Sequence, residues 1–224
     1  MIARWPCPGP GGPHDELAIA FDRSRARRLL VVPALFEEAN RTRRFLVETM
    51  RRLDQAGIDS FLPDLPGCNE SLQPFAEQSL ATWREAMIAA QRHFAATEVL
   101  SLRGGTLVAP ERSPGWQLEP VAGKSLLRQL LRARSIAARE AGREERLETL
   151  LEEGRISGLE LAGYPCSAML ITGLEEATPA ATEALLQVKQ TQLGGGAQWL
   201  RSEPSEDAAQ SDALSALIAA GARH

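Results

Sequence analysis

Aromatic residues and cysteines are both scarce in this chain of 224 residues. Phe, Trp and Tyr together make up 5% of it, so a core must consist mainly of Leu, Ile, Val and Ala. The three cysteines, Cys7, Cys68 and Cys166, are too few and too widely spaced for a disulfide framework or a cysteine metal site. We therefore expect a reducing compartment, the cytoplasm, and neither a metal nor another cofactor.

Long apolar runs and an excess of positive charge are missing as well. No segment has the roughly 20 consecutive apolar residues that a membrane-spanning helix needs, and the N-terminal stretch lacks the apolar core of a signal peptide. The formal net charge of -4 disfavours a general nucleic-acid binder, which needs a basic face to neutralise phosphates. The sequence therefore predicts no transmembrane segment and no nucleic-acid partner.

A basic stretch is nevertheless present between residues 124 and 143. Its cations are Lys124, Arg128, Arg132, Arg134, Arg139 and Arg143. A solvated helix face explains such a stretch. The alternative is an anionic partner, such as an acidic protein surface, a polyphosphoryl lipid carrier or membrane headgroups.

Short apolar runs alternate with amphipathic stretches in the first half of the chain. The runs at 29–32, 58–62 and 98–102 predict buried strands, and the stretches at 41–56 and 75–95 predict helices. The first 16 residues, rich in Pro and Gly, predict an irregular entry. This alternation predicts an α/β fold with a mostly parallel sheet covered by helices on both faces.

The second half of the chain has a weaker pattern. We expect one domain over residues 1–224, with a mainly helical, cap-like region at 124–190 that includes a helix at 182–188. A flexible hinge is expected at 194–196, and Trp199 is expected to close the late part of the fold. Whether this C-terminal third completes the sheet stays open.

Six segments appear in order between residues 30 and 170, and together they carry a family resemblance. They are VVPALFEEANRTRR, DLPGCNES, TWREAM, SLRGG, EPVAGKSLLRQLLR and LELAGYPCSAML. The set resembles the second type of exosortase A system-associated hydrolases, which belong to the α/β-hydrolase superfamily, over about two-thirds of the chain. The resemblance implies an α/β-hydrolase-like fold and a cytoplasmic role in an exosortase or exopolysaccharide system of Gram-negative bacteria.

The residues that would carry hydrolysis depart from that superfamily's pattern. An active member holds its nucleophile on a sharp strand-to-helix turn, G-x-S-x-G. Here the turn reads Ser101-Leu102-Arg103-Gly104-Gly105, so Arg103 takes the nucleophile position. A guanidinium stays protonated and cannot attack a carbonyl. Ser101 stands two residues before the nucleophile position. We favour its interpretation as a small residue that permits the turn over its interpretation as a nucleophile.

A general base is missing too. The histidines are His14, His93 and His224, and only His224 follows the turn, as the order of residues in this fold requires. It is the last residue, and chain ends are usually frayed. The sequence therefore predicts a protein without Ser-His-Asp hydrolysis.

Cys68 is the alternative nucleophile. It follows the second predicted strand, on the side where such sheets bind ligands. Asp64 and Glu70 nearby are expected to raise the pKa of its thiol, and a small residue in a tight loop is the favoured interpretation. An esterase, thioesterase or acyltransferase that uses Cys68 stays the alternative function.

Two carboxylates, Glu37 and Glu38, stand in the loop where an active enzyme places oxyanion donors. We hypothesise that Arg103 pairs with one of them, since the fold brings both loops to one rim. The alternative is that both simply begin the next helix, whose dipole favours acidic residues. Arg103, Gly104, Gly105, Glu37, Glu38 and Asp64 thus form the candidate site of an accessory protein that binds a protein partner or an anionic ligand.

Overall fold

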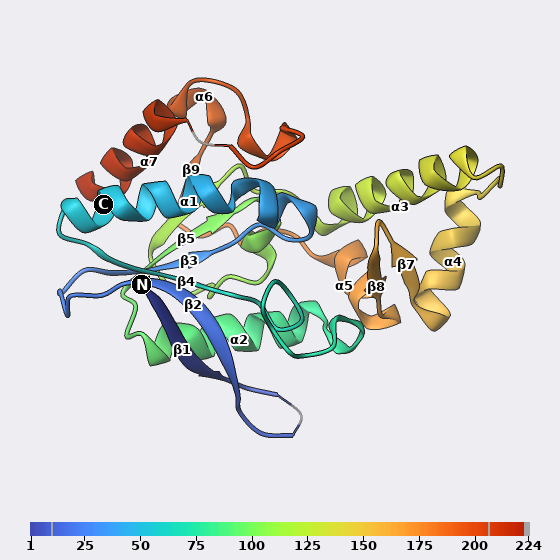
Figure 1. The fold of residues 1–224 in the computed structure, drawn as a ribbon, viewed down its shortest axis with the longest axis horizontal. Helices are drawn as coiled ribbons and strands as arrows, with labels where there is room; N and C mark the ends of the chain where they lie inside the picture. The colour runs from blue at the N-terminus through green and yellow to red at the C-terminus, as the bar shows by residue number, and fades with distance from the viewer. Residues whose placement is uncertain (10, 206, 222–224) are drawn as a thin grey trace.

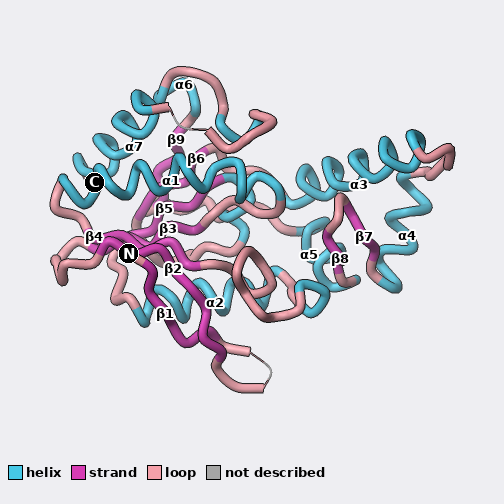
Figure 2. Tube along the Cα trace, viewed as in Figure 1, coloured by secondary structure: helices cyan, strands magenta, loops and turns pink. Residues whose placement is uncertain are grey.

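A seven-stranded sheet forms the centre of the computed structural model, which describes residues 1–9, 11–205 and 207–221 (Figures 1 and 2). The strand order is β1-β2-β4-β3-β5-β6-β9. The strands are β1 (Ile2–Cys7), β2 (His14–Phe21), β3 (Arg28–Val32), β4 (Asp59–Pro63), β5 (Glu98–Leu102), β6 (Gly115–Leu118) and β9 (Leu185–Val188). The five neighbouring strands β4, β3, β5, β6 and β9 run parallel to one another. The β1–β2 hairpin extends the sheet by antiparallel pairing of β1 with β2 and of β2 with β4. The predicted α/β fold with a mostly parallel sheet is confirmed.

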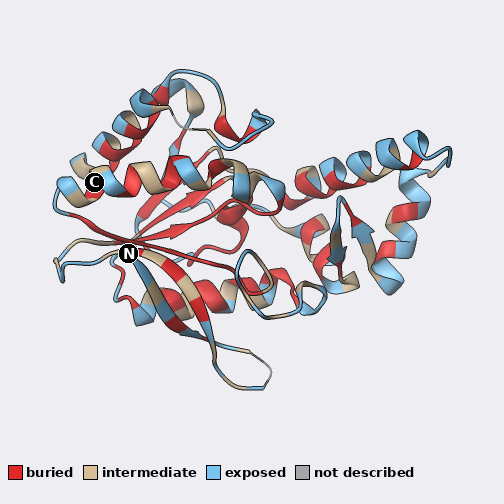
Figure 3. Cartoon of the chain, in the orientation of Figure 1, coloured by how far each residue is buried: buried red, intermediate tan, exposed pale blue. Residues whose placement is uncertain are grey.

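Helices cover both faces of this sheet. Helices α1 (Glu37–Gln55) and α7 (Ala208–Ala220) lie on one face, and α2 (Leu80–His93), α3 (Gly123–Glu140) and α5 (Ala168–Glu176) pack on the other. Alternate residues of β3 point to opposite faces: Leu30 packs with the α2 side and Leu29 with the α1 side, both fully buried. Figure 3 shows the resulting buried layer along the strands. Burying each such Leu stabilises the fold by about 1.5–3 kcal/mol.

The first 16 residues correct the sequence prediction, because residues 2–7 and 14–16 lie in strands. Residues 2–7 form β1, which pairs along its length with β2. Trp5 and Cys7 point inward and are buried, while Pro6 between them is exposed. Pro6 is tolerated because β1 is an edge strand, where a missing N–H breaks no ladder.

The predicted helix at 75–95 is interrupted. A short 3-10 turn, η1 (Phe75–Glu77), precedes α2, and Gln78 and Ser79 separate the two. The Ser79 hydroxyl accepts from the backbone N–H of Thr82, and the Thr82 hydroxyl accepts from the backbone N–H of Ser79. This reciprocal cap fixes the start of α2.

Residues 123–176 extend from one end of the sheet (Figure 1). They comprise α3, α4 (Leu147–Ser157), the hairpin of β7 (Leu159–Leu161) and β8 (Tyr164–Cys166), and α5. The region predicted at 124–190 is therefore not helical throughout. The predicted helix at 182–188 is also wrong, since residues 185–188 return to the sheet as β9 beside β6. Pairing with an otherwise open strand edge outweighs local helix propensity there.

The chain after β9 folds back over the face that carries α1. This part of the chain contains helix α6 (Gln190–Leu193), the 3-10 turn η3 (Gln198–Leu200) and α7. Leu214 and Ile218 of α7 are buried against the sheet. His224, the histidine that follows the turn in the sequence, lies outside the described residues. No helix within the described ranges has the length and apolar character to span a bilayer. These residues also hold no group of three or more His, Cys, Asp or Glu side chains placed to bind a metal.

Candidate functional site

The carboxyl ends of β3 to β6 meet at one edge of the sheet, and the candidate site lies there. Pro33, Asp64, Arg103 and Glu119 each directly follow one of these four strands. In open parallel sheets this edge is where ligands bind. The topology therefore gathers the residues that the sequence singles out.

The turn after β5 has the tight geometry of a nucleophile-bearing turn. Arg103 begins the 3-10 turn η2 (Arg103–Leu107) with φ +53°, a left-handed conformation that non-glycine residues rarely adopt. A Cβ at Gly105 would stand 2.1 Å from the carbonyl oxygen of Pro33, and one at Gly104 2.6 Å from Leu126. Gly105 is therefore required by the close approach of the Pro33 backbone, whereas a side chain at position 104 would have to displace the end of the Leu126 side chain.

The Arg103 side chain is fully engaged at this turn. Its Nε and Nη2 donate to the two carboxylate oxygens of Glu38, each at 3.1 Å, and its Nη1 donates to the carbonyl oxygen of Glu119 at 3.3 Å. The guanidinium carbon lies 4.7 Å from the ring centroid of Trp199. A two-point Arg–carboxylate pair next to an aromatic ring is a strong and geometrically specific contact.

Glu38, and not Glu37, is the partner of Arg103. Glu37 pairs instead with Arg41 one turn along α1, and Arg41 also donates to the carbonyl oxygen of Trp199 at 3.1 Å. Both glutamates occupy the first turn of α1, so the helix-start interpretation also holds. Arg41 and Arg103 both contact Trp199 and so hold the η3 segment against the turn.

Ser101 lies inside the sheet. It is 1% exposed, and its hydroxyl donates to the carbonyl oxygen of Trp116 at 3.3 Å. The described histidines lie elsewhere. His93 ends α2 at the opposite edge of the sheet, and His14 begins β2, which is three strand spacings, about 14 Å, from β5. Neither His14 nor His93 is placed to activate a group at the tip of this turn.

The Cys68 thiol lies in a setting that keeps it protonated. Burial raises its pKa to about 12, and the nearby carboxylates of Asp64 and Glu16 add to the effect. Asp64 contributes as expected, but Glu16, which sequence reasoning missed, takes the role assigned to Glu70. Asp64 is itself occupied, since Arg43 and the amide nitrogen of Asn69 both donate to its Oδ1 at 2.7 Å.

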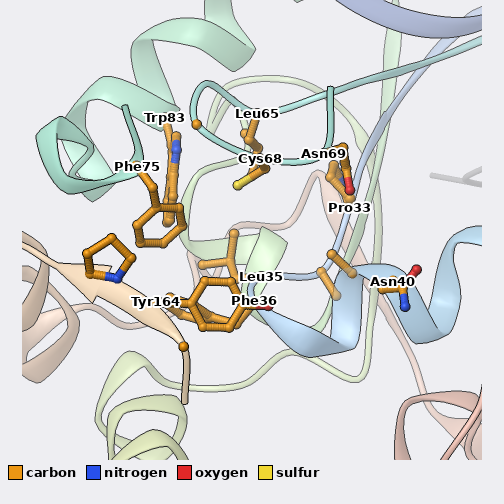
Figure 4. A pocket seen from close by; sticks show the side chains of 15 residues that line it. Pro33, Leu35, Phe36, Asn40, Leu65, Cys68, Asn69, Phe75, Trp83 and Tyr164 are labelled. Atoms are coloured by element: carbon orange, nitrogen blue, oxygen red, sulfur yellow. The ribbon is translucent and has the colours of Figure 1, made fainter. Parts of the chain in front are cut away.

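A pocket of about 270 Å³ opens beside Cys68 (Figure 4). Its walls come from the loop after β3, the loop after β4, α2 and the β7–β8 hairpin. The aromatic residues Phe36, Phe75, Trp83 and Tyr164 line it, and among the described residues no charged one does. Arg103 is not among the lining residues, so this pocket is separate from the ion pair.

Sequence reasoning missed most of this pocket and the contact of Arg103 with Glu119. Phe36, Phe75 and Tyr164 come from three distant segments, and no local pattern indicates that they meet. Trp199 was expected to close the late part of the fold. In the structure its ring packs on the guanidinium of Arg103.

The strand order, the parallel core and the strand-to-helix turn after β5 define an α/β-hydrolase-type fold. Among solved structures, the chain is similar to a thermophilic esterase from Thermogutta terrifontis, with a TM-score of 0.51 and 15% identity over 84% of this chain and 79% of that one. At that identity the likeness shows the fold alone.

Two further structures are less similar. A putative hydrolase from Agrobacterium vitis S4 gives a TM-score of 0.49 and 12% identity over 98% of both chains. The 2-hydroxy-6-oxo-6-phenylhexa-2,4-dienoate hydrolase from Rhodococcus sp. strain RHA1 gives 0.41 and 17% over 55% of this chain, and the match spans only 47% of that enzyme. No family model and no curated protein matches the sequence.

Proposed function

We propose that this protein is a non-catalytic accessory protein built on an α/β-hydrolase-type fold. The observation that carries the proposal is the Arg103–Glu38 ion pair, which occupies the tip of the turn where this fold presents a nucleophile. Both side chains are 12% exposed, and Trp199 covers the pair. A substrate carbonyl would meet a paired guanidinium at this point, and a guanidinium is no nucleophile.

The electrostatics of the turn also oppose acyl transfer. A tetrahedral intermediate needs hydrogen-bond donors around its developing negative charge. In this chain the loop after β3 leads instead into the carboxylates of Glu37 and Glu38. Carboxylate oxygens accept hydrogen bonds and donate none, so neither side chain can stabilise an oxyanion formed beside it.

Covalent capture tests the proposal. We expect the purified chain to show no mass increase after incubation with a fluorophosphonate probe, which reacts with activated serine hydroxyls, or after brief incubation at neutral pH with iodoacetamide, which alkylates activated cysteine thiolates. A stoichiometric adduct would overturn the proposal, and its absence from Ser101→Ala or Cys68→Ala would identify the nucleophile. Catalysis by Cys68 is the competing function, favoured by the thiol's position on the pocket wall.

The pathway assignment is a separate proposal. A cytoplasmic role in an exosortase or exopolysaccharide system, with a protein or anionic partner, rests on the six ordered sequence segments. Adjacent exosortase or glycosyltransferase genes would support this assignment. A consistent neighbourhood of unrelated metabolic genes would count against it without affecting the non-catalytic account.

A further inference from the structure

We propose that the pocket beside Cys68 binds an uncharged small molecule with a ring or short alkyl portion and a neutral polar end. The inference rests on the proposed non-catalytic function in one respect: the molecule is held and not cleaved. The pocket's composition, its electrostatics, its size and the strain at one wall residue all support it.

The aromatic wall is the first observation. The chain has only 11 aromatic residues, one Tyr, six Phe and four Trp, and four of them line this one pocket. The ring centroids of Tyr164 lie 5.4 Å from Phe36 and 5.3 Å from Phe75, and Trp83 lies 6.1 Å from Phe36 and 5.7 Å from Phe75. These separations are those of mutually packed rings, so the wall is preformed and suits an apolar ligand.

Charge is excluded from the pocket. None of its lining residues is charged, and the nearby Asp64 carboxylate is already paired with Arg43 and Asn69. A charged ligand group would leave water without gaining an opposite charge, which is costly. The occupant is therefore uncharged.

A neutral polar end is nevertheless accommodated. Figure 4 places Asn40 and Asn69 on the side of the pocket away from Phe75 and Trp83. The amide nitrogen of Asn69 is bonded to Asp64, which leaves its carbonyl oxygen to accept a hydrogen bond. A hydroxyl or amide at one end of the ligand matches these carboxamides.

The size of the pocket limits the ligand. An apolar cavity of about 150 Å³ is enough to hold benzene. The pocket has about 270 Å³, which corresponds to two fused rings or a short alkyl chain.

Backbone strain supports a functional wall. Phe36 has φ +58° and ψ -140°, a conformation that costs a non-glycine residue on the order of 1–3 kcal/mol. The strained backbone sets the Phe36 ring against Tyr164 and Trp83. Such strain persists mainly at sites where it shapes function.

Calorimetric titration with a matched pair of probes tests the proposal. At pH 7, 2-naphthol is neutral, and naphthalene-2-sulfonate has the same rings with a negative charge. We expect 2-naphthol to bind one site with Kd on the order of 100 µM and the sulfonate to bind at least tenfold more weakly. Absence of 2-naphthol binding, or equal binding of both probes, would overturn the inference.

Variants locate the site. Ala39 lines the pocket from α1, so Ala39→Phe fills it and is expected to weaken 2-naphthol binding at least tenfold. Ala137→Phe, on the exposed face of α3, is the matched control and leaves binding unchanged. Binding that survives Ala39→Phe places the probe elsewhere and contradicts the proposal.

Cys68 provides a second readout that does not depend on any variant. Bound 2-naphthol is expected to slow alkylation of Cys68 at least threefold, because this thiol lines the pocket. Unchanged alkylation at saturating 2-naphthol would contradict the proposal. Ester turnover together with pocket binding would refute the non-catalytic function alone, whereas neither turnover nor binding would refute the ligand alone.

Discussion

Arg103 and Glu38 form a two-point ion pair in which each side chain is only 12% exposed. Removing one partner leaves the other charge largely buried and uncompensated. We expect Arg103→Ala or Glu38→Ala to lower the free energy of unfolding by about 2–4 kcal/mol in urea denaturation. Arg51→Ala, which breaks a surface pair with Glu48, is the control and costs about 0–1 kcal/mol. An effect of Arg103→Ala as small as the control would show that the turn does not depend on the pair.

Gly105 is required by the closeness of the Pro33 carbonyl oxygen. A methyl group at position 105 would stand 2.1 Å from that oxygen, so one backbone segment must move. We expect Gly105→Ala to destabilise the fold by about 3 kcal/mol or more, measured by thermal and urea unfolding. Gly11→Ala adds a methyl group into open space and is expected to change stability by less than about 0.5 kcal/mol. Equal stability of the two variants would contradict the described geometry of the turn.

Asp22 gives the fold a defined dependence on acid. Hydrogen bonds from Arg28 hold the pKa of Asp22 at about 2, below its usual 3.8. A carboxylate with a lowered pKa stabilises the fold fully above its unfolded pKa and loses that contribution as pH falls through the folded value. Because Asp22 is 43% exposed, we expect Asp22→Asn to cost about 1 kcal/mol at pH 6.

The cost of Asp22→Asn should shrink between pH 4 and pH 2, as followed by urea unfolding at each pH. Gly11→Ala, which removes no ionisable group, serves as the control and should show no such trend. A cost that stays constant down to pH 2 would mean that Arg28 does not stabilise the charged form of Asp22.

Cys68 is expected to alkylate slowly and alone in the native protein. Its pKa of about 12 leaves little thiolate at pH 8, while Cys7 and Cys166 are 1% and 2% exposed. Mass spectrometry after iodoacetamide treatment should show a single slow modification at Cys68. The rate should be at least tenfold below that of an exposed peptide thiol and still rising from pH 8 to pH 10. Fast labelling that levels off below pH 8 would instead indicate an activated, catalytic cysteine.

Much of the sheet was predictable because its buried strands are short apolar runs. Residues 29–32, 58–62 and 98–102 overlap β3, β4 and β5 closely, and the amphipathic pattern located most of α1. Residues 2–7 and 185–188 were missed, since pairing with β2 and β6 makes them strands and no local pattern reveals those partners.

The candidate site was likewise predictable only in part. The place of Arg103 at the turn follows from its spacing to Ser101 and Gly105, and complementary charge pointed to Glu37 or Glu38 as partner. The choice of Glu38 depends on Arg41, which engages Glu37 one helical turn away. The aromatic pocket could not be predicted, because Phe36, Phe75 and Tyr164 meet only through the tertiary fold.

The most direct measurement is steady-state hydrolysis of p-nitrophenyl esters with acyl chains of two to ten carbons, using the intact protein and its Arg103→Ala, Ser101→Ala and Cys68→Ala variants. If Arg103 has replaced the nucleophile, all four proteins should release p-nitrophenol at the rate of the buffer blank for every ester. Saturable turnover by the unmodified protein that is lost in one of these variants would contradict the account.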